Sequence, residues 1–292
     1  MTSGVSIGMP VRNGASHIAT AIRSLQGQLY RDWHLLISDN ASTDATAAIC
    51  REFAIRDERI SLVVQKFDIG AAENFRFVLS KARQEYFMWA AADDVWDPQF
   101  MDACVSALVA RPDRGVAFTG IENIDANGHV LRRYPQLAGL GGPPSFLTVA
   151  RFLLHPEILG KANLVYGLYR TTLCRDVMSQ VGFPACWGSD MVFVLGAIAR
   201  AGLYIEPKVL FQKRVDASRE TVSAREAKLR FLPGNGFFPL DAYPDYRASL
   251  LVAVRGTRFE LGTQAIMKYR YLRAVLAARV EALRAHARSR FN

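Results

Sequence analysis

The chain has 292 residues, of which half are hydrophobic and 22% are charged, an ordinary composition for a globular protein. Its formal net charge of +9 favours an anionic partner such as a nucleotide, a lipid surface or a nucleic acid. The four cysteines form no Cys-x-x-Cys pair, no apolar stretch approaches the roughly 20 residues of a membrane span, and the N-terminus lacks a signal-peptide pattern. We therefore do not expect a disulfide framework, a zinc knuckle or a transmembrane helix. We expect the protein in a reducing, cytoplasmic compartment.

Strands and helices alternate through the first hundred residues. Short apolar runs predict strands at 5–9, 33–37, 60–64 and 86–90. Apolar residues at helical spacing predict helices at 15–27, 45–53, 74–82 and 98–111. Because the links between them are short, we expect an α/β fold with a mostly parallel sheet flanked by helices.

Each of the four predicted strands runs into polar residues. Asn13, Asp39 and Asp68 follow the first three strands, and the adjacent pair Asp93 and Asp94 follows the fourth. In open α/β sheets, ligands bind beyond the carboxyl ends of the strands, so these side chains are expected to converge on one ligand. Two adjacent carboxylates at such an edge suit a hard cation. Helix capping is the alternative for the second loop, although the strand-end position of Asp39 favours ligand contact.

The alternation becomes less regular beyond the acidic pair. The dipeptide Asn127-Gly128 predicts a hairpin with a two-residue turn. Further apolar runs predict strands at 116–119, 163–170, 203–206 and 209–211. The segment Ser189-Asp190 precedes an apolar helix predicted at 191–201.

The character of the sequence changes near residue 219. From Asp245 onwards, ten Lys and Arg residues face three acidic ones, and apolar residues recur at helical spacing. We expect one domain over 1–218 and a basic helical extension over 219–292. The basic helices suit an anionic membrane surface, and the alternative is that their apolar faces dock on the first domain.

Several segments, taken together and in order, resemble family-2 nucleotide-sugar glycosyltransferases of the GT-A fold. The resemblance covers about residues 4 to 218. It is carried by Met9-Pro-Val-Arg-Asn13, Ser38-Asp-Asn-Ala-Ser-Thr-Asp44, Asp68-Ile-Gly70 with Asn74, Asp93-Asp94, Asn163 to Arg170, Gly182-Phe-Pro and Ser189-Asp190.

This resemblance implies a nucleotide-sugar site in residues 1–97 and an acceptor site in residues 98–218. Asp39 would hydrogen-bond the nucleobase, and Asp93 would bind Mg²⁺ or Mn²⁺ on the diphosphate. The other residues implied in donor binding are Pro10, Val11, Asn13, Gly70 and Asn74.

The resemblance also implies the chemistry at the acceptor. Asp190 would be the base that deprotonates the acceptor hydroxyl, and its alternative role is a helix N-cap. The family inverts the anomeric configuration by direct displacement, so one base suffices. Trp187 would stack on an acceptor sugar or pack in the core. Adjacent side chains of an extended chain point to opposite faces, so Asp94 is expected to contact the acceptor or to hold the turn rather than to share the metal.

Three positions depart from the family pattern. Ala91 stands where an Asp usually precedes the metal-binding residue by two positions, Ile69 replaces a basic residue, and Asp216 aligns with a His that can reach the metal. Asp93 is therefore expected to bind the metal with water in place of the missing carboxylate, and Asp216 is a candidate second ligand.

The leading hypothesis is an inverting glycosyltransferase that acts on a glycan or lipid-linked acceptor in cell-surface polysaccharide synthesis. The alternative is a catalytically inactive protein that binds a nucleotide-sugar or serves as a scaffold, as suggested by Ala91 and by the missing histidine. Nucleic acid is not expected as a partner, because the basic helices show no aromatic interleaving or recognition motif.

Overall fold

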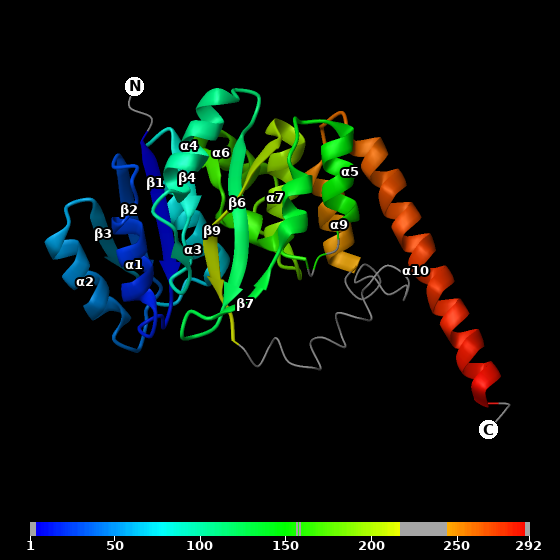
Figure 1. Cartoon of the computed structure of the whole chain (residues 1–292), viewed down its shortest axis with the longest axis horizontal. Coiled ribbons are helices and arrows are strands. Elements are labelled where there is room, and N and C mark those ends of the chain that lie inside the picture. Colours follow the sequence, from blue (N-terminus) through cyan, green and yellow to red (C-terminus); the bar gives the residue numbers. More distant parts are fainter. Residues whose placement is uncertain (1–3, 156, 158, 217–243, 290–292) are drawn as a thin grey trace.

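The computed structural model describes residues 4–155, 157, 159–216 and 244–289, and Figure 1 shows their arrangement. These residues form one nine-stranded mixed sheet with helices on both sides, so the expected α/β fold is confirmed. The strands are β1 (Val5–Val11), β2 (Trp33–Asp39), β3 (Ile60–Val64), β4 (Tyr86–Trp89), β5 (Val95–Trp96), β6 (Val116–Ile124), β7 (Val130–Arg133), β8 (Leu168–Arg170) and β9 (Leu203–Arg214).

Helices cover the sheet and close one end of the molecule. The α-helices are α1 (Ile18–Gln26), α2 (Thr46–Arg56), α3 (Ala71–Ser80), α4 (Phe100–Ala110), α5 (Phe146–Leu154), α6 (Thr171–Gln180), α7 (Ser189–Ala201), α9 (Pro244–Ala253) and α10 (Glu260–Ser289). Two 3₁₀ helices, η1 (Pro135–Leu140) and η2 (Lys161–Tyr166), lie in the connections.

The sheet order is β3-β2-β1-β4-β8-β6-β9-β5, and β7 pairs with β6 outside this path. Strands β1 to β4 are mutually parallel, as is the pair β6 and β9, whereas β5, β7 and β8 run antiparallel to their neighbours. The carboxyl ends of β1 to β4 therefore meet at one edge of the sheet, where the sequence predicted the site.

The centre of this parallel part is β1, in which every residue except Pro10 is buried. A strand buried on both faces is expected where helices cover both sides of a parallel sheet. A side chain at Gly8 would come within 2.6 Å of Val78 on α3, so glycine allows this helix to pack closely on the strand.

Two helices of the second half were not predicted. Helix α5 follows a segment rich in Gly and Pro, and Ser145 caps it by accepting a hydrogen bond from the backbone N–H of Thr148 (3.2 Å). Helix α6 follows β8 directly, without a turn residue to mark the change. The strand predicted at 163–170 was too long, because Asn163 donates to the carbonyl of Gly160 (3.0 Å) and closes a 3₁₀ turn instead.

Two predicted boundaries were also wrong. The strands predicted at 203–206 and 209–211 are one strand, β9, whose register against β6 shifts beside Gly120. Pro207 lies at this irregularity and lacks the N–H group that a regular ladder requires. The β6–β7 hairpin exists, but Asp125 pairs with His129, so its turn is longer than two residues.

Helices α9 and α10 pack on the rest of the described chain, as Figure 1 shows at the end that also carries α5. Tyr246, Leu250, Val254 and Met267 are buried in the common core. The docking alternative thus holds for this part of the helices. The predicted boundary near 219 lies outside the described residues. Among the helices that are described, none combines the length and the apolar character needed to span a membrane.

A buried ionic cluster fastens these helices to the core. Lys161 donates to Glu157 (2.9 Å) and to the carbonyls of Phe152 (3.0 Å) and His155 (2.7 Å). Arg270 of α10 reaches the same carboxylate at 3.3 Å. Burial lowers the pKa of Lys161 to about 8, although the Glu157 carboxylate opposes this shift.

Candidate active site

The loops after β1 and β2 are joined by hydrogen bonds. Asn13 adopts a left-handed conformation (φ 55°), which asparagine tolerates. Its side-chain oxygen accepts from the N–H of Thr43 (2.9 Å), and its own N–H donates to the hydroxyl of Ser42 (2.8 Å). Asn13 therefore holds the two loops in register, and its contact with a nucleotide stays a prediction.

Asp39 lies at the end of β2 with no exposed surface. One carboxylate oxygen accepts a hydrogen bond from the hydroxyl of Ser42, and the other oxygen is buried without a partner among the described residues. A buried acceptor without a donor is costly, and each such group calls for an explanation. The N–H of a bound nucleobase is the type of donor that would satisfy it.

A small pocket of about 200 Å³ opens between the strand-end loops. Four residues predicted to bind the donor line it, namely Pro10, Val11, Gly70 and Asn74. Gly70 has a φ of 84° at the start of α3, a conformation that favours glycine. The side-chain amide of Asn74 donates to the carbonyl of Ser38 (2.9 Å), so Asn74 also ties α3 to β2.

Two further lining residues carry charge. Arg12 forms an ion pair with Asp68 (2.6 Å), and the side chain of Asn40 donates to the same carboxylate (2.6 Å). The sequence predicted that Asp68 lies in a loop at a strand end. It did not predict the ion pair with Arg12, because the two loops are far apart in the chain. Both side chains of the ion pair are partly exposed and face the small pocket.

A large pocket of about 670 Å³ adjoins the small one, and the two share Ala71 and Phe75 on α3. Its wall includes Tyr166, Trp187 and Asp190. The structure thus brings two of the three predicted acceptor-side residues, Trp187 and Asp190, into one pocket beside the donor loops, whereas the third, Asp94, does not line it. A ligand in the small pocket can extend past α3 into the large pocket.

Asp190 lies in the first turn of α7, and its carboxylate accepts a hydrogen bond from the N–H of Met191 (2.7 Å). Burial raises its pKa above the ordinary value for aspartate. The N-cap of α7 is Gly188, so the N-cap alternative for Asp190 is wrong. Asp190 instead makes a hydrogen bond within the first turn and also faces the pocket. Trp187 packs edge-on against Tyr246 (5.3 Å between ring centroids) and keeps 40% of its surface exposed.

The acidic pair is split by the fold. Asp93 is exposed, whereas Asp94 has no exposed surface and accepts a hydrogen bond from the N–H of Arg214 (2.9 Å). Burial raises the pKa of Asp94 to about 7. In this structure Asp94 holds β9 against the acidic turn, which is the second of its two expected roles. Its contact with an acceptor stays a prediction.

Two basic residues at the end of β9 contact the acidic turn, and sequence reasoning missed the first of them, Lys213. Lys213 lies 3.9 Å from the second oxygen of Asp94. Arg214 donates to the carbonyls of Asp93 (3.1 Å) and Asp125 (2.7 Å) and so fastens the acidic turn to the β6–β7 hairpin. No local pattern marks these contacts, because β9 follows the acidic pair by more than a hundred residues.

The expected metal ligands do not form a cage. Asp93 and Asp216 are both exposed, and Ala91 supplies no carboxylate. Over the described parts of the chain, no three His, Cys, Asp or Glu side chains come together in a way that could hold a metal ion. These residues fit only an ion whose ligands come mainly from a bound diphosphate, a common arrangement for Mg²⁺.

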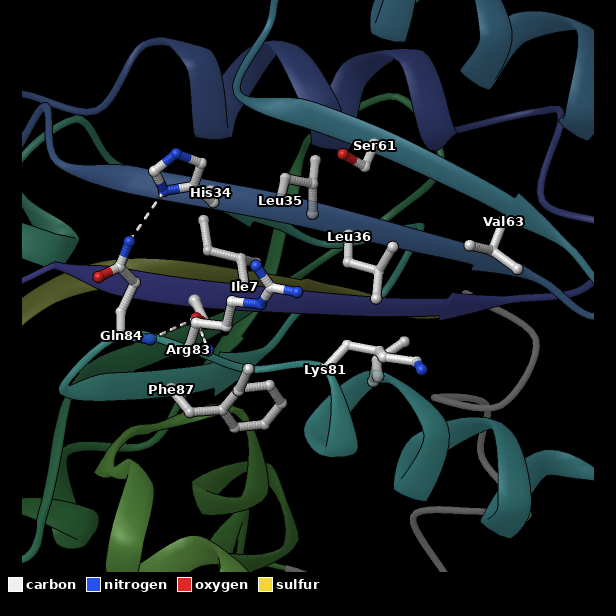
Figure 2. Close-up of a pocket in the computed structure, with 13 residues that line it drawn as sticks. Ile7, His34, Leu35, Leu36, Ser61, Val63, Lys81, Arg83, Gln84 and Phe87 are labelled. Atoms are coloured by element: carbon white, nitrogen blue, oxygen red, sulfur yellow. Dashed lines mark hydrogen bonds between the residues drawn. The ribbon is translucent and has the colours of Figure 1, made fainter.

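A third pocket, of about 430 Å³, lies toward the amino ends of β1 and β2, away from the strand-end loops (Figure 2). His34 and Gln84 are linked across it at 3.2 Å. None of the predicted site residues lines this pocket. The candidate active site is therefore the pair of adjoining pockets on the opposite edge.

Comparison with known proteins finds glycosyltransferases among the relatives of this chain. The family described as "Glycosyl transferase family 2" matches residues 6–161, more than half of the chain. The glycosyltransferase EpsE of Bacillus subtilis is 31% identical over 131 residues, which are 44% of this chain and 47% of EpsE. The teichuronic acid biosynthesis glycosyltransferase TuaG of the same organism is 27% identical over 180 residues, which are 62% of this chain and 66% of TuaG. The chain thus spans about half to two thirds of these relatives.

Solved structures share the fold. TarS 1–349 of S. aureus in complex with UDP-GlcNAc superposes with a TM-score of 0.65 at 17% identity and covers 92% of this chain and 72% of TarS 1–349. The mannosyltransferase PcManGT of Pyrobaculum calidifontis, solved with GDP-Man and Mn²⁺, gives a TM-score of 0.54 at 17% identity and covers 96% and 75%. At these identities the likeness shows the fold alone.

Proposed function

Because this chain belongs to glycosyl transferase family 2, we propose that it transfers a sugar from a nucleotide-diphosphate sugar to a hydroxyl group of a glycan or lipid-linked acceptor during cell-surface polysaccharide synthesis. One observation carries the proposal. Two adjoining pockets share Ala71 and Phe75, and the larger contains a half-buried carboxylate, Asp190. The named activity of the relative TuaG supports the class of acceptor.

The proposed mechanism is a single displacement. The nucleotide lies in the small pocket, and a nucleobase N–H donates to the unpartnered oxygen of Asp39, which neighbours the lining residue Asn40 and becomes accessible when the ligand binds. The sugar extends toward the large pocket, and Asp190 takes the proton of the acceptor hydroxyl. The hydroxyl oxygen forms a bond to the anomeric carbon as the bond to the diphosphate oxygen breaks. Attack opposite the leaving group inverts the anomeric configuration, and the nucleoside diphosphate departs.

We propose Asp93 as the protein ligand, and Asp216 as a second candidate, for an Mg²⁺ or Mn²⁺ ion that arrives with the diphosphate. When bound, such an ion neutralises the charge that develops on the leaving group. The exposed position of Asp93 beside the site supports this assignment, and the PcManGT structure with Mn²⁺ is a precedent within the same fold.

Asp39→Asn is expected to weaken donor binding by about tenfold or more, because the substitution replaces a charged acceptor by an amide of the same shape. The donor is first identified from the rise in Tm with UDP-, GDP- and dTDP-sugars, each with and without Mn²⁺. Calorimetry then compares the affinities of the two proteins for that donor. Asp176→Asn, on the exposed part of α6, is the matched control and is expected to bind as the wild type does. Equal affinity of Asp39→Asn and the wild type would remove Asp39 from the donor site.

We also propose that the protein works on the cytoplasmic face of a membrane, with α10 on the anionic surface. Figure 1 shows this helix extending beyond the body of the molecule. Tyr269 and Leu272 are 57% and 59% exposed, and Lys268, Arg273 and Arg279 are exposed as well. Each basic residue near such a surface contributes on the order of 1 kcal/mol. Four cysteines without a disulfide are consistent with a reducing compartment.

The double variant Arg273→Glu/Arg279→Glu is expected to bind vesicles containing phosphatidylglycerol about tenfold or more weakly than the wild type. Co-sedimentation measures the bound fraction, and vesicles of phosphatidylcholine alone give the baseline. Arg51→Glu/Arg56→Glu on α2 makes the same change in net charge at exposed positions and is the control. An equal loss in both double variants would assign the effect to net charge rather than to α10.

A further inference from the structure

Lys213 is set apart from its neighbours by the alternation of β9. Gln212 donates to Glu122 (2.8 Å), and Arg214 reaches the backbone of the hairpin, so these two side chains lie on one face of the strand. Lys213 points to the other face. Because β9 pairs with β5, which begins directly after the acidic pair, its ammonium group lies beside Asp94.

This ammonium group lies between the acidic turn and the wall of the large pocket. Its nitrogen lies 5.1 Å from the centroid of the Tyr166 ring, which lines the large pocket. Burial alone would lower the pKa of Lys213, but the acidic groups around it, Asp94 foremost and then Tyr166, Asp93 and Asp190, hold that pKa above its ordinary value. Lys213 therefore carries a positive charge at neutral pH.

The ion pair with Asp94 does not use the hydrogen-bonding capacity of this group. At 3.9 Å the two atoms are beyond hydrogen-bond range, and the Asp94 oxygen that faces Lys213 has no hydrogen-bond partner among the described residues. An ammonium group has three donors and binds phosphate as a compact point charge. Lys213 does not itself line either pocket, but its side chain is 28% exposed and lies beside Tyr166 of the large pocket wall.

We propose that the ammonium group of Lys213 binds the diphosphate of the donor, and that donor binding therefore persists without a divalent metal ion. The inference rests on the proposed function and deepens it. Ala91 removes one carboxylate from this edge of the sheet, while Lys213 adds a fixed cation beside the remaining pair. An ammonium group held next to the acidic turn attracts the same phosphate oxygens that a metal ion would bind.

Calorimetry with nucleotides tests the proposal without an acceptor. UDP, UMP, GDP and GMP are titrated into the wild type in Mn²⁺ and in EDTA. The preferred diphosphate is expected to bind in EDTA within about tenfold of its affinity in Mn²⁺. Lys213→Met is expected to lower its affinity in EDTA by at least about tenfold, with a smaller effect on the matching monophosphate. Lys213→Arg keeps the charge and is expected to retain most of the affinity.

A second variant separates ligand binding from a purely structural role beside Asp94. Asp94→Asn/Lys213→Met removes both charges, so the protein is left without an uncompensated carboxylate. It is expected to bind the diphosphate as weakly as Lys213→Met does. Wild-type affinity for the diphosphate in the double variant, or in Lys213→Met itself, overturns the proposal. A loss of affinity greater than about tenfold when the wild type is moved from Mn²⁺ to EDTA overturns it as well. If none of these nucleotides binds in either condition, and dTDP does not bind either, the proposed function is overturned as well.

Discussion

Asp190→Asn is expected to lower the rate of sugar transfer by about 10²- to 10⁴-fold, the contribution of a positioned general base. The amide keeps the shape of the side chain, and its oxygen can still accept from the N–H of Met191, so the start of α7 is preserved. Donor affinity is expected to stay near that of the wild type, because Asp190 lies in the large pocket rather than in the small one. Release of the nucleoside diphosphate in the presence of a panel of glycan acceptors measures the rate.

The pH profile of the same reaction gives an independent check. A general base acts in its deprotonated form, and burial raises the pKa of Asp190. Activity is therefore expected to fall as the pH decreases through a value above the ordinary pKa of aspartate. This acidic limb should be absent from the residual activity of Asp190→Asn. A variant as active as the wild type would exclude Asp190 as the base, and donor binding without any turnover in the wild type would favour the inactive alternative.

Glu157→Ala is expected to lower the free energy of unfolding by about 3–5 kcal/mol, the typical cost of breaking a buried ion pair from one side. The Glu157 carboxylate is the partner of two buried cations, Lys161 and Arg270. Its loss removes the carboxylate that both cations share and lowers the pKa of Lys161 further, since the carboxylate raises that pKa. Urea unfolding followed by circular dichroism measures the change.

Two other variants define what this effect means. Glu157→Gln keeps the shape of the side chain and removes its charge. It is also expected to destabilise the protein, because the buried cations Lys161 and Arg270 lose the carboxylate between them. Glu52→Ala removes an exposed ion pair with Arg56 (3.6 Å) and is expected to have little effect, as is usual for surface pairs. If Glu157→Ala and Glu52→Ala unfold at the same urea concentration, the buried cluster does not hold α10 to the core.

The parallel half of the sheet was predictable because each of its signals is local. Apolar runs identify β1 to β4, and strand-end residues such as Asp39 identify the edge where loops converge. The helices α5 and α6 were missed because a Gly- and Pro-rich segment obscured one cap and no turn residue precedes the other helix. Local patterns cannot show such features when tertiary packing decides them.

The candidate site also combines features that local sequence patterns predict with features that only the tertiary structure shows. The sequence predicted that Asp93 and Asp94 differ in role, because alternation along an extended chain is local. It could not predict that Lys213 lies beside Asp94, since the pairing of β9 with β5 joins segments about 120 residues apart. Asn13 shows the opposite difficulty: its position pointed to a ligand, and in the structure its hydrogen bonds go to the neighbouring loop.

The ionic cluster around Glu157 has a consequence for synthesis of the chain. Arg270 follows Glu157 by 113 residues, so at roughly 5–20 residues per second it emerges on the order of ten seconds later. During that interval the surfaces that α9 and α10 cover, including the large apolar side of α7, are open to other proteins. The α/β part must therefore remain folded, or be protected by a chaperone, until its last helices arrive.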